Sequence, residues 1–261
     1  MSVSLIISTY NRPDALFCVL ESILIQTKLP NQIIIADDGS NDKTKKCITE
    51  FNKSSTLQLI HSWQQDKDFR VAESRNKAIA KSTCEYIIMI DGDMILHHKF
   101  IEDHLNHAEL GFFVQGSRVF LDKKRTNQAL EACLSEFSFF SKGLSNRKNA
   151  IYSPFFSKLF LKKKNYTTGI KTCNMSFYKK DLIKVNGFNN DIVGWGREDT
   201  EFAVRLLNFG INRKNVHFNL IQFHLWHEKS SRALLTKNDA ILQNTINSKL
   251  DWCKNGISKF L

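Results

Sequence analysis

Residues 3–40 read VSLIISTYNRPDALFCVLESILIQTKLPNQIIIADDGS, and they contain two apolar runs that each end in a polar cluster. Val3–Ser8 precedes TYNRP, and Gln32–Ala36 precedes DDGS. Apolar runs without polar alternation are typical of strands covered on both faces, which are mostly parallel. Pro13 is placed to begin a helix between them, with an apolar face formed by Leu16, Leu20, Ile23 and Leu24. The stretch therefore predicts a strand–helix–strand unit.

The same alternation continues beyond residue 40. Ser40 and Asp42 offer capping side chains for a helix that runs to about Phe51. A third helix is predicted over residues 71–81, and the apolar run Tyr86–Ile90 ends in DGD. Strands that alternate with helices predict an α/β fold with a doubly wound, mostly parallel sheet, in which ligands bind beyond the carboxyl ends of the strands.

The second half of the chain is less regular. Phe112–Leu121 reads as another strand, Phe218–Phe223 as a strand-like apolar run, and residues 230–261 as one or two helices. Residues 141–165, SKGLSNRKNAIYSPFFSKLFLKKKN, mix basic and aromatic side chains. They favour either a basic surface loop with a short helix, or a segment whose aromatic residues enter lipid while its lysines meet anionic headgroups. The residues concerned are Phe155, Phe156, Leu159, Phe160, Lys158 and Lys162–Lys164.

Composition sets broad limits. A chain of 261 residues with 42% hydrophobic residues and only three prolines fits one large α/β domain, with or without an appendage. Its six scattered cysteines form no C-x-x-C pair, which predicts free thiols in a reducing compartment. The N-terminus has no signal-peptide pattern, and no apolar run approaches about 20 residues. We expect a cytoplasmic protein, or one peripheral at the inner face of the cell membrane.

The chain is strongly basic, with a net charge of +11 from 37 Lys and Arg against 26 Asp and Glu. This charge favours a polyanionic partner such as nucleic acid, an anionic membrane face or a nucleotide diphosphate. A diffuse, solvated basic surface is the competing interpretation, and composition does not choose between them.

The clusters TYN, DDGS and DGD all follow predicted strands, so we expect them to meet in one crevice. Each could be an ordinary turn, because Asn, Asp and Gly are common there. In DGD, Asp91 and Asp93 can share Mg²⁺ or Mn²⁺ if a substrate diphosphate completes the coordination shell. The alternative for this pair is a solvated Asp-Gly turn.

Three other residues could join this crevice. His224 and His227, in FHLWHE, could complete a metal site or could be packed core residues, and no cysteine lies nearby for a zinc site. Arg75 could hold a phosphate or an aspartate of the crevice, or face solvent. The motifs G-x-G-x-x-G, G-x-x-x-x-G-K-[ST] and G-x-S-x-G are absent, so a dinucleotide site, a P-loop and the simplest serine hydrolase are not indicated.

Residues 194–199 read GWGRED, which places Trp195 between two glycines and ahead of two adjacent carboxylates. The hexapeptide is either a surface turn that leads into a helix or an aromatic flap beside a catalytic acid or base. By itself it does not distinguish these.

In order and spacing, the motifs together resemble a GT-A-fold glycosyltransferase of family 2. The resemblance covers roughly residues 2–228, and its N-terminal motifs are SLIISTYNRPDALFCVLESILIQT, IIIADDGSNDKT, FRVAESRNKAIA and EYIIMIDGDMI. The segment NMSFYKKDLIKVNGFNNDIVGWGREDTEFAVRLLNFG is similar to the acceptor region of β-1,4-galactosyltransferase and chondroitin-polymerase type enzymes. Arg197 departs from that pattern, which often has glycine at this position.

The resemblance implies a Rossmann-like, mostly parallel sheet flanked by helices, with a C-terminal helical extension. Residues 1–228 would form the GT-A domain, with a nucleotide-sugar half at 1–121, a basic aromatic insert at 141–165 and an acceptor half at 166–228. Residues 229–261 would form the helical tail.

The resemblance also implies roles for individual residues. On the donor side, Ser8, Tyr10 and Asp38 would hold the nucleotide base. Asp37 and Arg75 would support that pocket, and Asp91 would face the ribose. Asp93 would coordinate Mn²⁺ or Mg²⁺, with His227 as the second metal ligand and His224 as the fallback. On the acceptor side, Asp199 would be the catalytic base and Glu198 would orient the acceptor, in a pocket lined by Trp195 and Gly196.

The implied reaction is a metal-dependent, inverting transfer of a hexosyl or N-acetylhexosaminyl group from a UDP-sugar. The acceptor would be a hydroxyl of a glycan or lipid-linked molecule in surface polysaccharide biosynthesis, with contact to an anionic membrane and no role for nucleic acid. Two alternatives stand beside it. One is a nucleotidyltransferase on a related scaffold, for which TYNRPDA offers only Arg12 as a phosphate-binding cation. The other is a non-catalytic basic module that binds glycans or nucleic acid.

Overall fold

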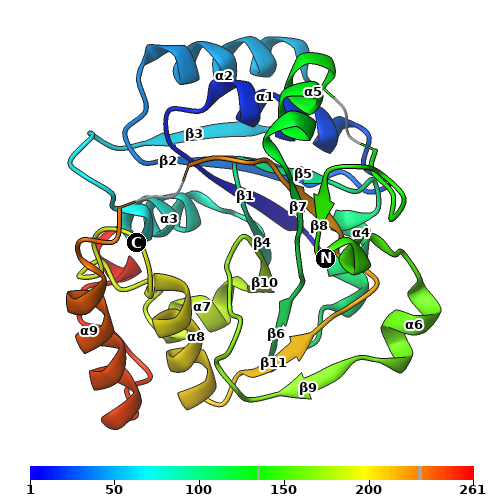
Figure 1. The fold of residues 1–261 in the computed structure, drawn as a ribbon. Helices are drawn as coiled ribbons and strands as arrows, with labels where there is room; N and C mark the ends of the chain where they lie inside the picture. Colours follow the sequence, from blue (N-terminus) through cyan, green and yellow to red (C-terminus); the bar gives the residue numbers. More distant parts are fainter. Residues whose placement is uncertain (134–135, 229–230) are drawn as a thin grey trace.

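Strands and helices alternate through the first 91 residues, as the apolar runs predict (Figure 1). The computed structural model describes residues 1–133, 136–228 and 231–261, with the backbone alone described at Lys164. The elements of this part are β1 (Val3–Thr9), α1 (Pro13–Leu24), β2 (Gln32–Asp37), α2 (Asp42–Ser54), β3 (Leu59–Trp63), α3 (Val71–Lys81) and β4 (Tyr86–Asp91).

The rest of the chain contains shorter elements. They are β5 (Met94–Leu96), α4 (Phe100–His107), β6 (Phe112–Gln115), β7 (Val119–Leu121), α5 (Lys123–Ala132), β8 (Leu144–Ser145), η1 (Arg147–Ala150), α6 (Pro154–Leu159), β9 (Lys162–Lys164), β10 (Asn174–Tyr178), α7 (Lys179–Lys184), α8 (Glu198–Asn208), β11 (Asn212–Asn215), β12 (Gln222–His224), α9 (Leu235–Asn247) and η2 (Ile257–Lys259).

An eight-stranded sheet organises the fold, in the order β3-β2-β1-β4-β10-β6-β11-β9. Strand β10 is antiparallel to both of its neighbours and β9 is antiparallel to β11, whereas the other neighbours are parallel. The predicted α/β sheet is therefore confirmed, and it is a mixed sheet. Because β1, β2, β4, β6 and β11 run in the same direction, the polar clusters that follow them meet at one edge.

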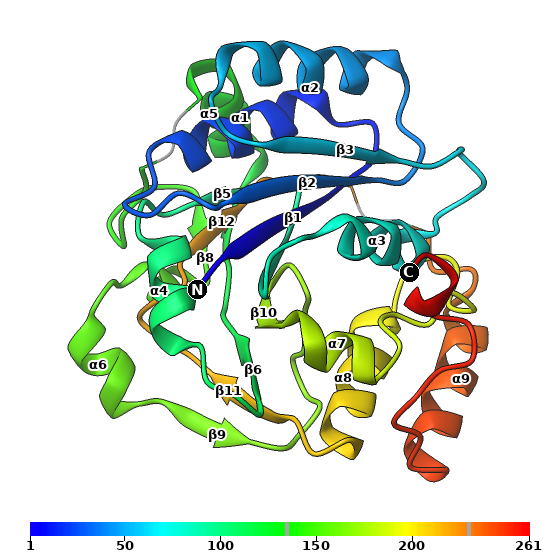
Figure 2. The same ribbon diagram turned by 180° about the vertical axis from the view of Figure 1, so that it is seen from behind.

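Helices cover both faces of this sheet (Figures 1 and 2). Side chains of a strand alternate between the faces, so Leu5 packs with α1, α2 and α4 whereas Ile6 packs with α3, α7 and α8. The strands β1, β2 and β4 are buried on both faces, as their unbroken apolar sequences predict. No helix among the described residues is long and apolar enough to cross a membrane.

A smaller four-stranded sheet, in the order β5-β12-β7-β8, positions part of the site. Strand β5 begins directly after the DGD cluster, and β12 pairs with it so that His224 lies opposite Met94. This register brings His224 next to Asp93, although the two residues are far apart in the sequence. Ile95, Val119 and Phe223 form the core beneath this sheet.

Two predicted strands differ from the structure. Phe112–Leu121 is two strands, because β6 belongs to the large sheet and β7 to the small one. The strand is interrupted at Gly116, where a Cβ atom would lie 2.4 Å from Oδ1 of Asn174. In the predicted strand Phe218–Phe223, only Gln222 and Phe223 are extended in β12. Phe218 and Leu220 have φ angles of 64° and 56°, which interrupt a strand.

The end of α2 and its cap also differ in detail from the prediction. The helix runs to Ser54 rather than Phe51, and the side chain of Asn41, not that of Ser40 or Asp42, accepts a hydrogen bond from the N–H of Lys43. Ser40 instead accepts a hydrogen bond from the N–H of Asn11 and so joins two of the polar clusters. The six cysteines are free thiols, as predicted.

Residues 141–165 contain β8, η1, α6 and β9, so the short helix of this segment is present. Ser153 caps α6 by accepting a hydrogen bond from the N–H of Phe156. The rings of Phe156 and Phe160 contact Phe218, yet both residues remain exposed together with Phe155 and Leu159.

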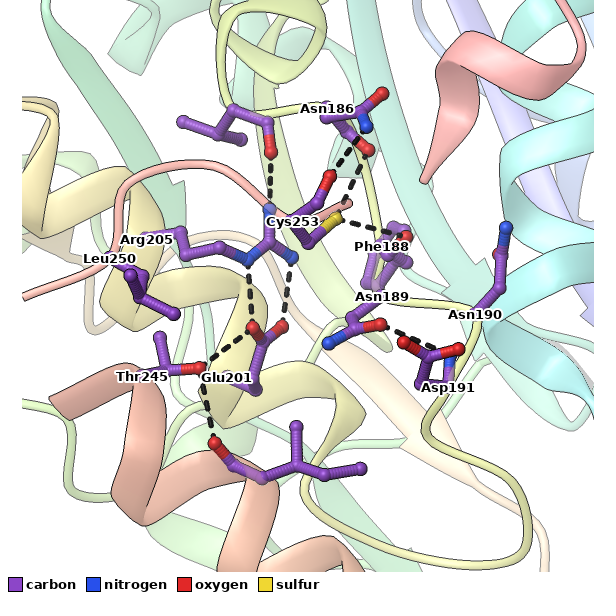
Figure 3. Close-up of polar contacts among 12 residues, drawn as sticks. Asn186, Phe188, Asn189, Asn190, Asp191, Glu201, Arg205, Thr245, Leu250 and Cys253 are labelled. Carbon is purple, nitrogen blue, oxygen red and sulfur yellow. Dashed lines mark hydrogen bonds and ion pairs between the residues drawn. The ribbon is translucent and has the colours of Figure 1, made fainter. Parts of the chain in front are cut away.

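The C-terminal segment packs onto α8 and α3, and the C-terminus lies near α3 (Figures 1 and 2). Residues 229 and 230, where the expected tail begins, lie outside the described residues. A buried ion pair between Arg205 and Glu201 of α8 forms the centre of this contact, and the hydroxyl of Thr245 in α9 donates to Glu201 (Figure 3). Ile257 of η2 belongs to the core on the α3 side of the large sheet.

We predict that Glu201→Gln lowers the free energy of unfolding by about 3–5 kcal/mol, because the buried Arg205 then keeps a charge without its counterion. Urea unfolding measures this value. As a control, Glu50→Gln breaks the exposed Lys46–Glu50 pair and should cost less than about 1 kcal/mol. A loss for Glu201→Gln as small as that of the control would contradict the prediction.

Candidate active site

The guanidinium group of Arg75 lies at the centre of the polar edge. It is buried in α3, and it donates to Oγ of Ser8 at 3.0 Å, to Oδ1 of Asp91 at 3.1 Å and to Oδ1 of Asp199 at 2.9 Å. Oε1 of Glu198 lies 3.8 Å from the same group. Arg75 therefore joins the ends of β1 and β4 to the start of α8.

Asp199 is held from two sides. Besides Arg75, Thr172 contributes its backbone N–H, 3.1 Å from Oδ2, and its hydroxyl group, which donates to Oδ1. Oδ1 thus accepts two hydrogen bonds and Oδ2 accepts one. A carboxylate oxygen has two lone pairs, so Oδ2 retains one that can accept a proton.

Glu198 lies in a different environment from Asp199. It is buried, and its Oε2 has no hydrogen-bond partner among the described residues. Burial and the neighbouring charge of Asp199 raise the pKa of Glu198 to about 8, against the opposing effect of Arg75. At neutral pH this carboxyl group is therefore largely protonated.

The GWGRED segment is a turn with left-handed backbone that leads into α8. Gly194, Gly196 and Arg197 have φ angles of 78°, 102° and 81°. Glycine adopts these values without strain, whereas Arg197 does not, which gives a physical reason for glycine at this position in the related pattern. The side-chain amide of Asn238 in α9 donates to the carbonyl groups of Val193 and Gly196. The C-terminal segment therefore fixes the turn that carries the two carboxylates.

Trp195 is partly exposed in this turn, and the guanidinium carbon of Arg232 lies 4.9 Å from the centre of its ring. Arg197 pairs with Asp239 of α9. Both contacts involve the segment after residue 230.

Asp93, His224 and His227 form a second cluster beside these carboxylates. One ligand atom from each residue lies within 4.8 Å of the other two. Nε2 of His224 and Nε2 of His227 lie 3.7 Å and 3.5 Å from Oδ2 of Asp93. The structure thus brings together both histidines, the expected ligand and its fallback.

The three side chains suit a divalent cation. Oδ1 of Asp93 is buried without a hydrogen-bond partner among the described residues, as expected for an oxygen that needs a cation. Nδ1 of His227 lies 2.6 Å from the carbonyl oxygen of Glu228, which leaves Nε2 available as a ligand. Burial lowers the pKa of His224 to about 3, so its imidazole is neutral at pH 7.

The expected nucleotide-binding residues lie at the ends of β1 and β2. Asp37 is buried, where it accepts from the N–H of Ser40 and contacts Nε2 of His61 at 2.8 Å. Asp38 accepts from the side chain of Gln64 and from the N–H of Arg70. Burial raises the pKa of Asp38 to about 6.

Tyr10 is 47% exposed, and its hydroxyl group donates to Asp66. Its ring therefore has a face open to a ligand. Ser8 is less available to a ligand than Tyr10, because its hydroxyl oxygen already accepts the hydrogen bond from Arg75.

Sequence reasoning missed Thr172 and Arg118 at this edge, and it named Arg12 only for the nucleotidyltransferase alternative. Thr172 holds Asp199, and Arg118 lies between β6 and β7 with Nη1 3.6 Å from Sγ of Cys173. Arg12 lies 3.5 Å from Oδ2 of Asp93, so the one cation available to a nucleotidyltransferase is already paired. Arg12 and Arg118 each follow a strand of a sheet, a position that could have identified them. Thr172 lies in an irregular segment and carried no such signal.

Comparison with known families agrees with this geometry. Residues 4–187 match the model described as glycosyl transferase family 2, and residues 156–228 match the model described as the N-terminal domain of galactosyltransferase. The first match covers most of the chain. The chain therefore belongs to glycosyl transferase family 2.

Curated relatives are longer proteins. The chain is 24% identical over 228 residues to hyaluronan synthase of Pasteurella multocida, an alignment that covers 80% of this chain and 23% of the relative. It is 24% identical to chondroitin synthase of Escherichia coli, over 82% of this chain and 33% of the relative. It is 25% identical to validoxylamine A glucosyltransferase of Streptomyces hygroscopicus subsp. limoneus, over 80% and 48%. The chain thus spans between about a quarter and a half of these relatives.

Solved structures share the GT-A fold. TarS of S. aureus, residues 1–349, superposes with a TM-score of 0.65 at 13% identity, over 95% of this chain and 65% of that one. The mannosyltransferase PcManGT of Pyrobaculum calidifontis, in complex with GDP-Man and Mn²⁺, gives a TM-score of 0.60 at 14% identity, over 95% and 71%. The expected GT-A fold is therefore confirmed.

We predict that the contribution of Glu198 to stability falls as pH rises from about 4.5 to about 8. In this range the raised pKa keeps Glu198 protonated in the folded state but not in the unfolded chain, so unfolding releases a proton at this position. Glu198→Gln removes this contribution, so the melting temperature of the variant should rise relative to that of the wild type between pH 5 and pH 8. The exposed Glu131→Gln should keep the wild-type slope. Identical slopes for wild type and Glu198→Gln would exclude a raised pKa.

Proposed function

We propose that the chain catalyses an inverting transfer of a hexosyl or N-acetylhexosaminyl group from a UDP-sugar to a hydroxyl of a glycan or lipid-linked acceptor in surface polysaccharide biosynthesis. The observation that carries the proposal is the position of Asp199, which lies at the start of α8 and is joined through Arg75 to Asp91. Asp91 is two residues from the cluster of Asp93, His224 and His227. The proposed base and the proposed metal site thus lie side by side at one edge of the large sheet.

Asp199 would act as the base. A sugar hydroxyl has a pKa far above 7, so a carboxylate within hydrogen-bond reach must remove its proton during attack. Arg75 and Thr172 orient Asp199, with the free lone pair of Oδ2 as the proton acceptor. Glu198, protonated in its buried position, would donate a hydrogen bond to orient the acceptor. Trp195 and Gly196 would line the acceptor pocket.

Asp93, His224 and His227 would hold a divalent cation. Two imidazole nitrogens favour Mn²⁺ over Mg²⁺, which prefers an all-oxygen shell. When bound, Mn²⁺ supplies the positive charge that stabilises the departing diphosphate. TarS has been solved in complex with UDP and with UDP-GlcNAc, and PcManGT in complex with GDP-Man and Mn²⁺, which supports a nucleotide-sugar donor and a metal for this chain.

The ends of β1 and β2 would receive the nucleotide. The ring of Tyr10, which is 47% exposed, would stack on the uracil, beside Ser8 and Asp38, with Asp37 as support. Asp91 would accept a hydrogen bond from the ribose. The roles of these residues are those that the family resemblance implies, and their positions are those in the structure.

An aromatic patch on α6 supports the proposal of contact with an anionic membrane. The patch consists of Phe155, Phe156, Leu159 and Phe160. Phe155 is 71% exposed and Leu159 is 64% exposed. Lys158, Lys162 and Lys163 lie on or next to this helix, so apolar side chains and cations occur together, as in interfacial segments. The side chain of Lys164, also expected here, lies outside the described residues.

We predict that the protein binds vesicles rich in phosphatidylserine at low salt. The double change Phe155→Ser and Leu159→Ser should reduce the bound fraction in co-sedimentation by about tenfold or more, because each side chain contributes about 1.5–3 kcal/mol when buried. Phe17→Ser, an exposed position on α1, is the matched control and should bind as wild type does. Equal binding by all three proteins would exclude this patch as the contact.

We predict that Asp199→Asn lowers the rate of sugar transfer by about 10²–10⁴-fold, because the amide cannot accept the proton. UDP release measured with a panel of UDP-sugars and glycan acceptors, with Mn²⁺ and with EDTA, identifies the active donor. Affinity for UDP should stay within a few-fold of wild type. Asp191→Asn, an exposed position in the preceding loop, should keep full activity. Transfer by Asp199→Asn within tenfold of wild type would refute the assigned base.

A further inference from the structure

A hollow of about 210 Å³ lies beside the proposed base, at the ends of β6 and β11. Lys171 and Cys173, which line it, flank Thr172, the residue that holds Asp199. The rest of its lining includes Arg118, Asn146, Asn149 and Asn215. Nothing in the proposed reaction so far uses this hollow.

The lining contains two cations and no carboxylate. None of the ion pairs between described residues includes Arg118 or Lys171. Nε of Arg118 is buried without a hydrogen-bond partner among the described residues, its Nη1 lies 3.6 Å from Sγ of Cys173, and its guanidinium carbon lies 4.8 Å from the centre of the Phe120 ring. Burial raises the pKa of this thiol to about 12, so it carries no charge that could neutralise Arg118.

The neighbouring carboxylates are already engaged. Asp91 pairs with Arg75, and Asp93 lies 3.5 Å from Arg12. Neither belongs to the lining of the hollow. Arg118 thus presents a buried donor and a positive charge that the described side chains of the hollow do not satisfy, which is the arrangement expected where an anion binds.

Position separates the hollow from the base end of the nucleotide, although Arg118 lies close enough to Asp93 and His224 for its charge to act on both. Strands β4 and β10 lie between β1 and β6, so the end of β6 is three strands from that of β1, roughly 14 Å at the usual spacing. The volume of about 210 Å³ is large enough for a sugar unit.

We propose that this hollow binds a sugar unit that carries an anionic group, either a carboxylate or a phosphate, and that Arg118 and Lys171 recognise this group. The inference rests on the proposed glycosyl transfer and specifies its substrate class. The anionic sugar enters on either the donor or the acceptor. In both cases the hollow places it next to Asp199 and beyond the diphosphate.

Binding without catalysis provides the first test. Saturation-transfer NMR compares methyl β-D-glucuronide with methyl β-D-glucoside on the full chain with UDP and Mn²⁺. We expect binding of the glucuronide alone, and a loss of about 10- to 100-fold in its affinity in Arg118→Gln and in Lys171→Gln. Lys148→Gln, which removes a nearby charge outside the lining, should bind as wild type does. Equal binding of glucuronide and glucoside by the wild type would overturn the proposal, as would no binding of either.

Kinetics provides the second test and separates the sources of the anion. Transfer is measured with uronate and neutral sugars, first on the donor and then on the acceptor. The value of kcat/KM for the uronate substrate should fall about 10- to 100-fold in Arg118→Gln, while the neutral counterpart changes less than about twofold. A weaker affinity of Arg118→Gln for UDP would assign Arg118 to the diphosphate and overturn the proposal. A wild-type protein that binds the glucuronide but transfers no sugar would refute the proposed function and leave the subsite standing.

Discussion

The buried guanidinium group of Arg75 is the interaction on which the site depends. Asp91, Asp199 and the protonated Glu198 converge from β4 and α8, and the two carboxylates repel each other without a cation between them. Arg75 supplies that cation from α3 and also binds Ser8 at the end of β1. A single side chain therefore joins α3 and the ends of β1 and β4 to the start of α8. Its planar set of donors, which lysine lacks, allows one group to serve several acceptors.

The register of the small sheet brings Asp93, His224 and His227 together. Strand β12 pairs with β5 so that His224 lies opposite Met94, directly after Asp93. His227 follows three residues later and is oriented through Glu228. The cluster therefore joins the first half of the chain to the second. The C-terminal segment also contributes to the site, because its Asn238 fixes the turn before Asp199.

The sequence predicts the features that local interactions determine, and it does not predict those that depend on contacts between distant segments. The buried strands and α3 are predicted because local apolar patterns define them. The expectation that the polar clusters after the strands meet at one edge also places Asp91 and Asp93 correctly. Tertiary contacts decided the rest. The break between β6 and β7 depends on the close packing of Gly116 against Asn174, which no periodicity reports. Arg118 follows β6, a strand-end position that could have identified it, whereas Thr172 lies in an irregular segment and had no local signal.

The central claim is that Asp93, His224 and His227 hold the metal that a UDP-sugar needs. Calorimetric titration of UDP with Mn²⁺ and with EDTA tests it, using wild type, His224→Ala, His227→Ala and the control His98→Ala outside the cluster. The account predicts Mn²⁺-dependent binding of UDP by wild type and by His98→Ala, with affinity lowered by about tenfold or more in the two cluster variants. UDP affinity that is equal in Mn²⁺ and EDTA, or unchanged in both variants, would contradict it.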